Sequence, residues 1–333
     1  MSKESFYVTT PIYYVNGEPH IGTAYTTVAT DATARFARMD GRDVFFLTGM
    51  DEHGEKVAEA AAAHDMTPQE WCDSQVTQFT ELWRDLDITN DDFIRTTQPR
   101  HVKGVQDFMQ KLHDNGYLYK GTYDGYYCTP CETQFTEGDL VDGKCPDCGR
   151  EVKVIHEENW FFKLSEFGDK LLAYYDEHPN FIRPQIRENE IRSFIEGGMH
   201  DLSVSRTAFD WGIPLPFDPE HVTYVWVDAL INYLTALGYG SDDTTLLERF
   251  WPANFHFVGK DIIRFHCVIW PAMLMAAGME CPRHVFAHGF LMAADGSKMS
   301  KSKGNALYPR DLIERYGVDA YRYYFLSDVT FGS

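Results

Sequence analysis

Apolar residues near the amino terminus first form a continuous run and then recur at helical spacing, which predicts a strand followed by a helix. Residues 6–14 are rich in aromatic and β-branched side chains and predict a buried strand. After a turn at Asn16-Gly17, apolar residues recur at helical spacing from 21 to 39, and Gly41 is expected to end that helix. The short apolar run 44–47 predicts a second buried strand.

The same alternation continues along the chain and predicts an α/β fold. Further candidate strands are at 93–97, 222–227, 255–258 and 284–291. Helical spacing is found after Gly54 and at 101–115, 165–177, 189–197, 261–277 and 310–316. Strands that alternate with helices predict a parallel sheet whose crossovers are right-handed.

The segment from 117 to 205 breaks this alternation and predicts an insertion. Its first part, up to residue 150, is rich in Gly, Cys, Asp and Tyr, so we expect something other than a large core to hold it. We therefore predict one α/β domain in two halves, 1–116 and 206–292, with the insertion between them. A polar loop and the start of a helical region are expected at 293–333.

Composition and charge narrow the class of protein. The chain has 333 residues, of which 44% are hydrophobic and 24% charged, as in ordinary soluble domains. A net charge of −20 argues against broad, nonspecific binding of nucleic acid, so an RNA partner would meet only a local patch. The start lacks a secretion signal, and no apolar run reaches the roughly 18 residues of a membrane span. We therefore predict a cytoplasmic protein without a membrane partner.

Four cysteines in the insertion form two Cys-x-x-Cys pairs, which predict a metal site. The pairs are Cys128 with Cys131 and Cys145 with Cys148. Four thiolates on two tight turns suit one tetrahedral zinc ion, and such a site is structural because no coordination position stays open. Iron could take the same ligands. Unrelated buried thiols and a redox role are competing interpretations, although the loop-rich setting argues against redox chemistry.

Two short motifs could bind phosphate. The first, residues 19–23, lies where a strand turns into a helix, so free backbone N–H groups and the positive end of the helix dipole could face an anion. Here His20 could donate a hydrogen bond to phosphate, and Gly22 would let a base approach the backbone. The alternative is a simple turn with a surface histidine.

The second motif is a loop at 297–305 that contains Lys298, Lys301 and Lys303. Such a cluster can neutralise a polyphosphate, because in nucleotidyl transfer the protein mainly positions groups and stabilises charge. The alternative is a solvated basic loop.

Together, in this order and separated by an insertion, the two motifs resemble the signature pair of class I aminoacyl-tRNA synthetases. Four stretches resemble the methionyl-tRNA synthetase family in particular: TTPIYYVNG at 9–17, LTGMDEHG at 47–54, YVWVDA at 224–229 and VGKDI at 258–262. The resemblance runs from residue 6 to about residue 324. It implies a Rossmann-like nucleotide-binding domain, a connective insertion with a zinc knuckle at 128–148 that meets the acceptor end of tRNA, and the start of a stem-contact region.

The resemblance also implies roles for single residues. Asp51 would bind the methionine ammonium, and Gly259 and Asp261 would hold the ATP ribose. His20, Gly22 and Thr23 would face ATP, and Lys298 and Lys301 would meet its phosphates. The methionine side chain would be lined by Ile12, Tyr14, Trp226, Ala229, Tyr233 and His266.

The chemistry of these residues agrees, although each has a plainer interpretation. A carboxylate suits an ammonium in a closed pocket, but Asp51 could instead cap the helix after Gly54. Aromatic rings suit a thioether, yet Trp226 and Tyr233 could be core residues, either on one helix face or with a strand ending between them. His266 shares a helical face with apolar residues, where a histidine is more often part of the core.

Some positions depart from the family pattern. Thr23 stands where a second histidine is common, and it can donate a hydrogen bond but cannot carry charge. Leu230 and Ile269 stand where some relatives have proline and phenylalanine, so we expect the pocket wall of this chain to be shaped differently from theirs. The sequence stops at Ser333, whereas family members continue into a helical anticodon-binding domain. We therefore expect either an excised core or a naturally short protein.

The implied function is activation of L-methionine by ATP, with Mg²⁺, to methionyl-adenylate and transfer of methionine to the 3′ end of tRNA(Met). Another class I synthetase is one rival, but the enzymes for leucine, isoleucine and valine usually need a larger editing insertion. A cysteine enzyme would need a zinc ion in the substrate site, whereas the predicted zinc ligands lie in the insertion, away from Asp51. A catalytically impaired module that binds RNA or a partner is the other. The sequence indicates no oligomeric state.

Overall fold

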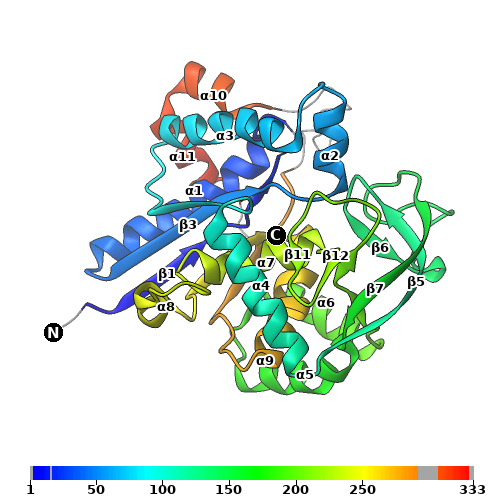
Figure 1. The fold of residues 1–333 in the computed structure, drawn as a ribbon. Coiled ribbons are helices and arrows are strands. Elements are labelled where there is room, and N and C mark those ends of the chain that lie inside the picture. The colour runs from blue at the N-terminus through cyan, green and yellow to red at the C-terminus, as the bar shows by residue number, and fades with distance from the viewer. Residues whose placement is uncertain (1–2, 16, 292–306, 330–333) are drawn as a thin grey trace.

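The computed structural model describes residues 3–15, 17–291 and 307–329 (Figure 1). The predicted loop at 297–305, with Lys298 and Lys301, and Asn16 of the predicted turn lie outside these residues. No helix within the described ranges is both long and apolar enough to cross a membrane.

A seven-stranded parallel sheet forms the centre of the molecule, in the order β2-β3-β1-β13-β14-β8, with β4 also paired to β3. Its strands are β1 (Ser5–Thr9), β2 (Tyr13–Tyr14), β3 (Asp43–Asp51), β4 (Asp92–Arg95), β8 (Ile182–Arg183), β13 (Phe255–Gly259) and β14 (Val285–His288). The predicted α/β, Rossmann-like fold with a parallel sheet is confirmed.

Alternating side chains of β1 explain why helices cover both faces of this sheet. Phe6 and Val8 pack against α1 (Ile21–Met39), while Tyr7 between them packs on the opposite side. The helices that share the α1 side are α3 (Pro68–Asp85) and α11 (Val318–Ser327). Those on the Tyr7 side are α4 (Pro99–Asp114), α7 (Val225–Thr235) and α9 (Trp270–Ala276). Figure 1 shows these two layers above and below the sheet.

The insertion carries a separate antiparallel sheet, at the right of Figure 1, in the order β6-β5-β7-β9. Its strands are β5 (Leu118–Cys128), β6 (Thr133–Phe135), β7 (Lys153–Phe162) and β9 (Leu202–Ser203). One strand from the predicted insertion, β8, pairs instead with β14 in the parallel sheet. The insertion is thus joined to the central sheet as well as standing beside it.

The remaining elements are short. A three-stranded sheet contains β10 (Ser205–Arg206), β12 (Asp218–Thr223) and β11 (Pro214–Leu215). The other helices are α2 (Glu55–Ala62), α5 (Gly168–Glu177), α6 (Gln185–Glu196), α8 (Thr245–Phe250) and α10 (Pro309–Tyr316). Single helical turns are η1 (Glu137–Asp139), η2 (Leu164–Phe167), η3 (Lys260–Ile262) and η4 (Phe265–Ile269), of which η4 is a π-helical turn.

Several predicted elements are wrong in their extent; the strand predicted at 284–291, for example, is only Val285–His288. The strand at 6–14 is interrupted after Thr9, and the strand at 222–227 ends at Thr223 because α7 begins at Val225. The single helix at 261–277 is instead three consecutive helical pieces, η3, η4 and α9. The helix at 21–39 is confirmed, and it is followed by Gly41 in a left-handed conformation with φ of 85°.

Candidate active site

Within the described ranges, several residues predicted to bind methionine or ATP lie at the carboxyl edge of the parallel sheet. Here β1 lies between β3 and β13, so the chain leaves the sheet in opposite directions on its two sides, which is where open α/β sheets bind ligands. Asp51 ends β3 and Gly259 ends β13. The structure therefore brings together residues that are about 200 positions apart in the chain.

Asp51 is a buried carboxylate with one oxygen that has no hydrogen-bond partner within the described part of the chain. The residue is 4% exposed, and the oxygen without a partner is Oδ1. Burial, followed by repulsion from Asp228, Glu132 and Glu52, raises the pKa of Asp51 well above its ordinary value. A cation placed at Oδ1 would relieve both effects. Asp51 does not cap α2, whose N-cap is Gly54.

A second buried carboxylate, Asp228 on α7, is held by two histidines. Its oxygens contact His53 Nδ1 and His101 Nε2, both at 2.6 Å, and His101 Nδ1 contacts Thr235 Oγ1 at 2.7 Å. Burial alone would raise the pKa of Asp228, but these two histidines more than offset it, so the pKa is lowered. The network fixes the first turns of α7 beside the residues that follow β3.

Trp226 and Tyr233 lie on α7, which settles the alternative that the sequence left open. The Trp226 ring is half-buried and stacks on Phe265, with centroids 4.1 Å apart and planes 14° apart. Tyr233 is buried and stacks on His256 at 4.1 Å. Ala229, on the same helix, is 6% exposed. Both rings thus have aromatic partners, as core residues do.

His266 lies on the π-helical turn η4 and is a neutral hydrogen-bond acceptor. Its Nδ1 lies 3.0 Å from the carbonyl of Ile262, which can only accept, so Nδ1 carries the proton. Nε2 then accepts from the Tyr233 hydroxyl at 2.7 Å. Burial lowers the pKa of His266 to about 4, so the ring stays uncharged near pH 7.

Ile12 and Tyr14 lie after β1, where the chain passes across the carboxyl edge. Both are half-buried and pack against the main core. The Tyr14 hydroxyl lies 3.0 Å from the carbonyl oxygen of His53 and 2.8 Å from Glu132 Oε1, and it donates its one proton to the nearer Glu132 oxygen. Tyr14 is therefore tied to the segment after Asp51 and to the insertion.

At residues 19–23 the structure corrects the expectation that the backbone N–H groups are free to bind an anion. His20 is the N-cap of α1, and its Nδ1 accepts from the backbone N–H groups of Gly22 at 3.1 Å and Thr23 at 3.4 Å. These two amides are therefore not free for an anion, because a side chain already satisfies them. Since Nδ1 accepts, the proton of the neutral ring is on Nε2, which leaves His20 the donor role predicted for it.

At the end of β13, Gly259 and Asp261 lie close together. A Cβ added to Gly259 would come within 2.4 Å of Asp261 Oδ1, so only glycine lets this carboxylate fold back on the strand end. Asp261 itself is exposed. Both residues predicted to hold a ribose thus stand at the same strand end.

The four cysteines of the insertion lie close enough to hold one metal ion. Their sulfur atoms all lie within 4.8 Å of one another, with Cys128 and Cys148 at 3.6 Å and Cys131 and Cys145 at 3.9 Å. Zn–S bonds of about 2.3 Å in a tetrahedron place sulfurs about 3.8 Å apart, so the spacing fits such an ion.

A family model described as tRNA synthetases class I (M) matches residues 6–154 and 149–333, which is nearly the whole chain. The chain belongs to this family.

Members of the family are similar over its full length. The chain is 56% identical over 331 residues to a methionine–tRNA ligase of Caldanaerobacter subterraneus subsp. tengcongensis and 55% identical to that of Thermotoga maritima. These alignments cover 99% and 98% of this chain but 52% of each relative. The chain therefore spans about half the length of the curated relatives it matches.

A solved structure of the same family superposes closely. Mycobacterium tuberculosis methionyl-tRNA synthetase in complex with methionyl-adenylate matches with a TM-score of 0.95 and 48% identity, over 99% of this chain and 65% of that one. The agreement covers both the parallel sheet and the insertion.

The sequence did not predict the residues that hold the candidate site residues in place. Asp228 and His53 lie in the family-like stretches 224–229 and 47–54, but the sequence predicted no role for either. His101 and Glu132 gave no signal, because their partners lie more than 100 positions away: 127 to Asp228 and 118 to Tyr14.

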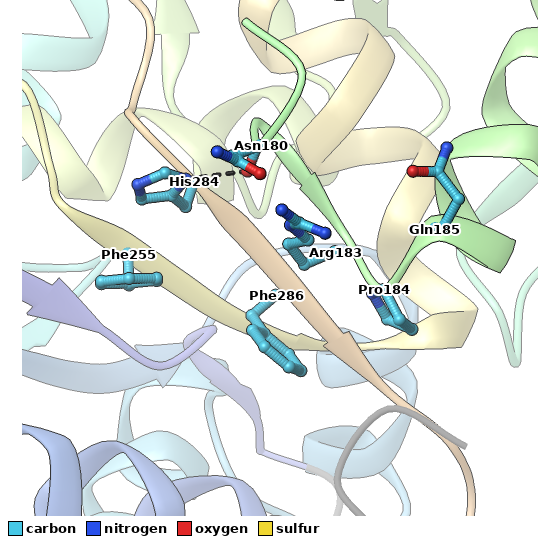
Figure 2. A pocket seen from close by; sticks show the side chains of 7 residues that line it. All are labelled: Asn180, Arg183, Pro184, Gln185, Phe255, His284 and Phe286. Carbon is cyan, nitrogen blue, oxygen red and sulfur yellow. Dashed lines mark hydrogen bonds between the residues drawn. The ribbon is translucent and has the colours of Figure 1, made fainter.

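A hollow of about 490 Å³ lies elsewhere in the synthetase fold and contains none of the predicted site residues. It is lined by Asn180, Arg183, Pro184, Gln185, Phe255, His284 and Phe286. Figure 2 shows these side chains beside β8, β13 and β14, with His284 bonded to the Asn180 carbonyl at 2.8 Å. Phe255 begins β13 and His284 precedes β14, whereas Pro184 and Gln185 follow β8, so the hollow lies along the β8 side of the sheet and not at the end of β3, where Asp51 is found.

Proposed function

We propose that this chain activates L-methionine with ATP and then esterifies the acceptor end of tRNA with it. The observation that carries the proposal is the buried, unpartnered Oδ1 of Asp51 at the carboxyl edge, next to Tyr14, with which Asp51 pairs in the sheet. A buried anion without a partner is costly, and an amino-acid ammonium would supply the missing charge. The methionyl-adenylate complex of the M. tuberculosis neighbour supports the same assignment.

The amino-acid end of the site is the part around Asp51, Tyr14 and α7. We assign the methionine ammonium to Asp51 and its side chain to the pocket lined by Ile12, Tyr14, Trp226, Ala229, Tyr233 and His266. A thioether is polarizable and packs well on rings. The neutral acceptor His266 keeps the pocket uncharged, which suits an uncharged side chain.

The phosphate end of the site is the part around His20, Thr23 and the end of β13. We assign the ATP ribose to Gly259 and Asp261, and its base to the backbone beside Gly22. His20 Nε2–H and Thr23 would donate to phosphate oxygens. Lys298 and Lys301, which lie outside the described residues, would add positive charge at the β and γ phosphates.

The chemistry has two steps. A methionine carboxylate oxygen bonds to the α-phosphorus of ATP, the bond from that phosphorus to the bridging oxygen breaks, and pyrophosphate leaves. A terminal ribose hydroxyl of tRNA then bonds to the methionyl carbonyl carbon, loses its proton to solvent, and displaces AMP. The nucleophile of the first step is already an anion, so the protein supplies position and charge stabilisation and no base is needed. Mg²⁺ bound with ATP would neutralise charge on the leaving pyrophosphate.

We propose that the metal of the four cysteines is a structural zinc ion. A site of four thiolates leaves no position open for substrate, so its contribution is to folding. Atomic emission should find one zinc per chain, and stripping the ion with a chelator should lower the melting temperature. A metal-free chain with an unchanged melting temperature would contradict the assignment.

ATP–pyrophosphate exchange run with each of the twenty amino acids tests the proposal. We expect exchange with methionine and little with the others, apart from minor activation of close analogues, because one methylene in an apolar pocket is worth only about 1–3 kcal/mol. No exchange with any amino acid would favour the catalytically impaired module instead. Charging of tRNA is assayed separately, since the chain spans half of its relatives.

A further inference from the structure

Glu132, the residue after the second zinc-ligand candidate, adopts a backbone conformation that its side chain does not favour. Its φ is 52°, in the left-handed region where a Cβ crowds the backbone. Glycine would meet least resistance there. The residue is also buried, at 3% exposed. The contacts of the Glu132 carboxylate must therefore compensate the cost of this backbone conformation.

The carboxylate receives three donors from three different elements. Oε1 accepts from the Tyr14 hydroxyl at 2.8 Å and from the backbone N–H of Lys56, in the first turn of α2, at 2.7 Å. Oε2 accepts from the hydroxyl of Tyr127 on β5. The backbone at Gly54 lies close to both groups, because a Cβ on Gly54 would come within 2.7 Å of Glu132 Oε1 and of the Tyr14 hydroxyl.

The backbone carbonyls of the same turn accept hydrogen bonds from residues at the start of α7, on the other side of the amino-acid end. Tyr224, the N-cap of α7, donates its hydroxyl to the Glu132 carbonyl at 2.5 Å. The indole of Trp226 donates to the Cys131 carbonyl at 3.4 Å. The turn that contains Cys131 and Glu132 therefore contacts both Tyr14 on β2 and Trp226 on α7.

We propose that Glu132 is a positioning residue that fixes the Tyr14 side of the pocket and thereby sets the affinity for the amino acid. It acts through Tyr14 and the start of α2, which follows Asp51, and it joins the four-cysteine knuckle to the substrate site. The inference rests on the proposed function, because it takes the pocket to be the methionine site. Its effect is confined to the amino-acid end, since no contact of Glu132 described here reaches His20, Gly259 or Asp261.

The test compares Glu132→Gln, Tyr14→Phe and the double variant in ATP–pyrophosphate exchange. Glutamine keeps the shape but cannot accept from all three donors, so we expect the KM for methionine to rise about tenfold. The KM for ATP and kcat should stay within about twofold. Tyr14→Phe removes one of the hydrogen bonds that Glu132→Gln alters. The rise in the KM for methionine in the double variant should therefore equal that of the more strongly affected single variant, and should not be the product of the two rises.

Glu137→Gln, on the exposed turn η1 of the same insertion, is the matched control and should behave as the wild type. Zinc content and melting temperature are measured for every variant. Unchanged methionine KM in Glu132→Gln, multiplicative effects in the double variant, or loss of zinc together with a rise in both KM values would each overturn the positioning role.

Methionine binding followed by tryptophan fluorescence separates this inference from the proposed function. A wild-type chain that binds and exchanges methionine, with a Glu132→Gln variant that binds it equally well, refutes the positioning role alone. A wild-type chain that neither binds nor exchanges methionine refutes both.

Discussion

The amino-acid end and the phosphate end of the site are built in different ways. At the amino-acid end, Asp51, Asp228, Tyr233 and His266 are almost fully buried, and all but Asp51 Oδ1 have their hydrogen bonds arranged within the chain. At the phosphate end, His20 is exposed and caps a helix.

The difference indicates where each part of the proposed reaction is prepared. Side-chain selectivity depends on shape, and shape needs groups that are locked before the substrate arrives. Phosphate stabilisation depends on charge and donors that meet a large, solvated ligand. We therefore expect substitutions at the two ends to act on different kinetic constants.

Replacing Lys301 with alanine should have the largest effect and should act on the phosphate end alone. Loss of one preorganised group that stabilises transition-state charge typically costs about 10²- to 10³-fold in kcat. ATP–pyrophosphate exchange should fall by that factor, while the dissociation constant for methionine, measured by fluorescence, stays the same. Lys111→Ala, an exposed lysine on α4, is the control. Undiminished exchange would remove Lys301 from the site.

Replacing Asp51 with asparagine should act on the amino-acid end alone. Truncating one partner of a buried charge pair costs about 2–5 kcal/mol, so the KM for methionine should rise by roughly 30-fold or more. The KM for ATP should not change. Asp65→Asn, on an exposed turn, serves as the control. If the KM for ATP rises equally, the two ends are not separable in this way.

His20 has two roles that asparagine can separate. Alanine should lower the free energy of unfolding by about 1 kcal/mol through loss of the N-cap, and asparagine, itself a good N-cap, should restore it. Both variants should lower kcat in the exchange assay by about tenfold, since neither places an imidazole N–H at the phosphate. Urea unfolding and exchange measure the two effects. An asparagine variant with wild-type kcat would leave His20 as a cap only.

The last predicted effect is a pH dependence of stability that belongs to Asp51 and leaves catalysis aside. Its pKa is raised by burial, so between the ordinary and the raised pKa the folded chain binds more protons than the unfolded chain. The stability of the free protein through this group therefore falls as pH rises across that window. The free energy of unfolding of Asp51→Asn minus that of the wild type should increase by about 1.4 kcal/mol for each pH unit within the window. A difference independent of pH would mean that Asp51 titrates normally.

The pattern of neighbouring residues predicted most helices and strands, but not the contacts that hold the site residues in place. Helix α1 follows from its apolar spacing, its cap and Gly41, all of which are neighbours in the chain. Helix α3 was overlooked although it carries a complete signal, a capping box of Thr67 and Glu70 with Pro68 at its first position. Spacing could not reveal that β12 ends at Thr223, because an apolar stretch fits a strand or a buried helix equally well.

The supporting contacts of the site depend on tertiary structure. Cys128, Cys131, Cys145 and Cys148 could be grouped from spacing, since ligand pairs on tight turns are local. The partners of Asp228 and Glu132 are set by how the sheet order brings α4, α7 and the insertion together. No sequence pattern encodes such a meeting, and motifs alone identified the residues expected to touch substrate but not those behind them.

The strand β8 has a consequence for anyone who wishes to shorten or transplant the insertion. It pairs Ile182 with Val285 and Arg183 with Phe286, so it covers the outer edge of β14. Deletion of residues 117–205 would remove β8 and leave the backbone groups of β14 unpaired beside Phe286. Bare edges of this kind attract strands of other molecules, and the trimmed protein would be expected to precipitate. A graft that stops before Phe181 would keep the border of the sheet closed.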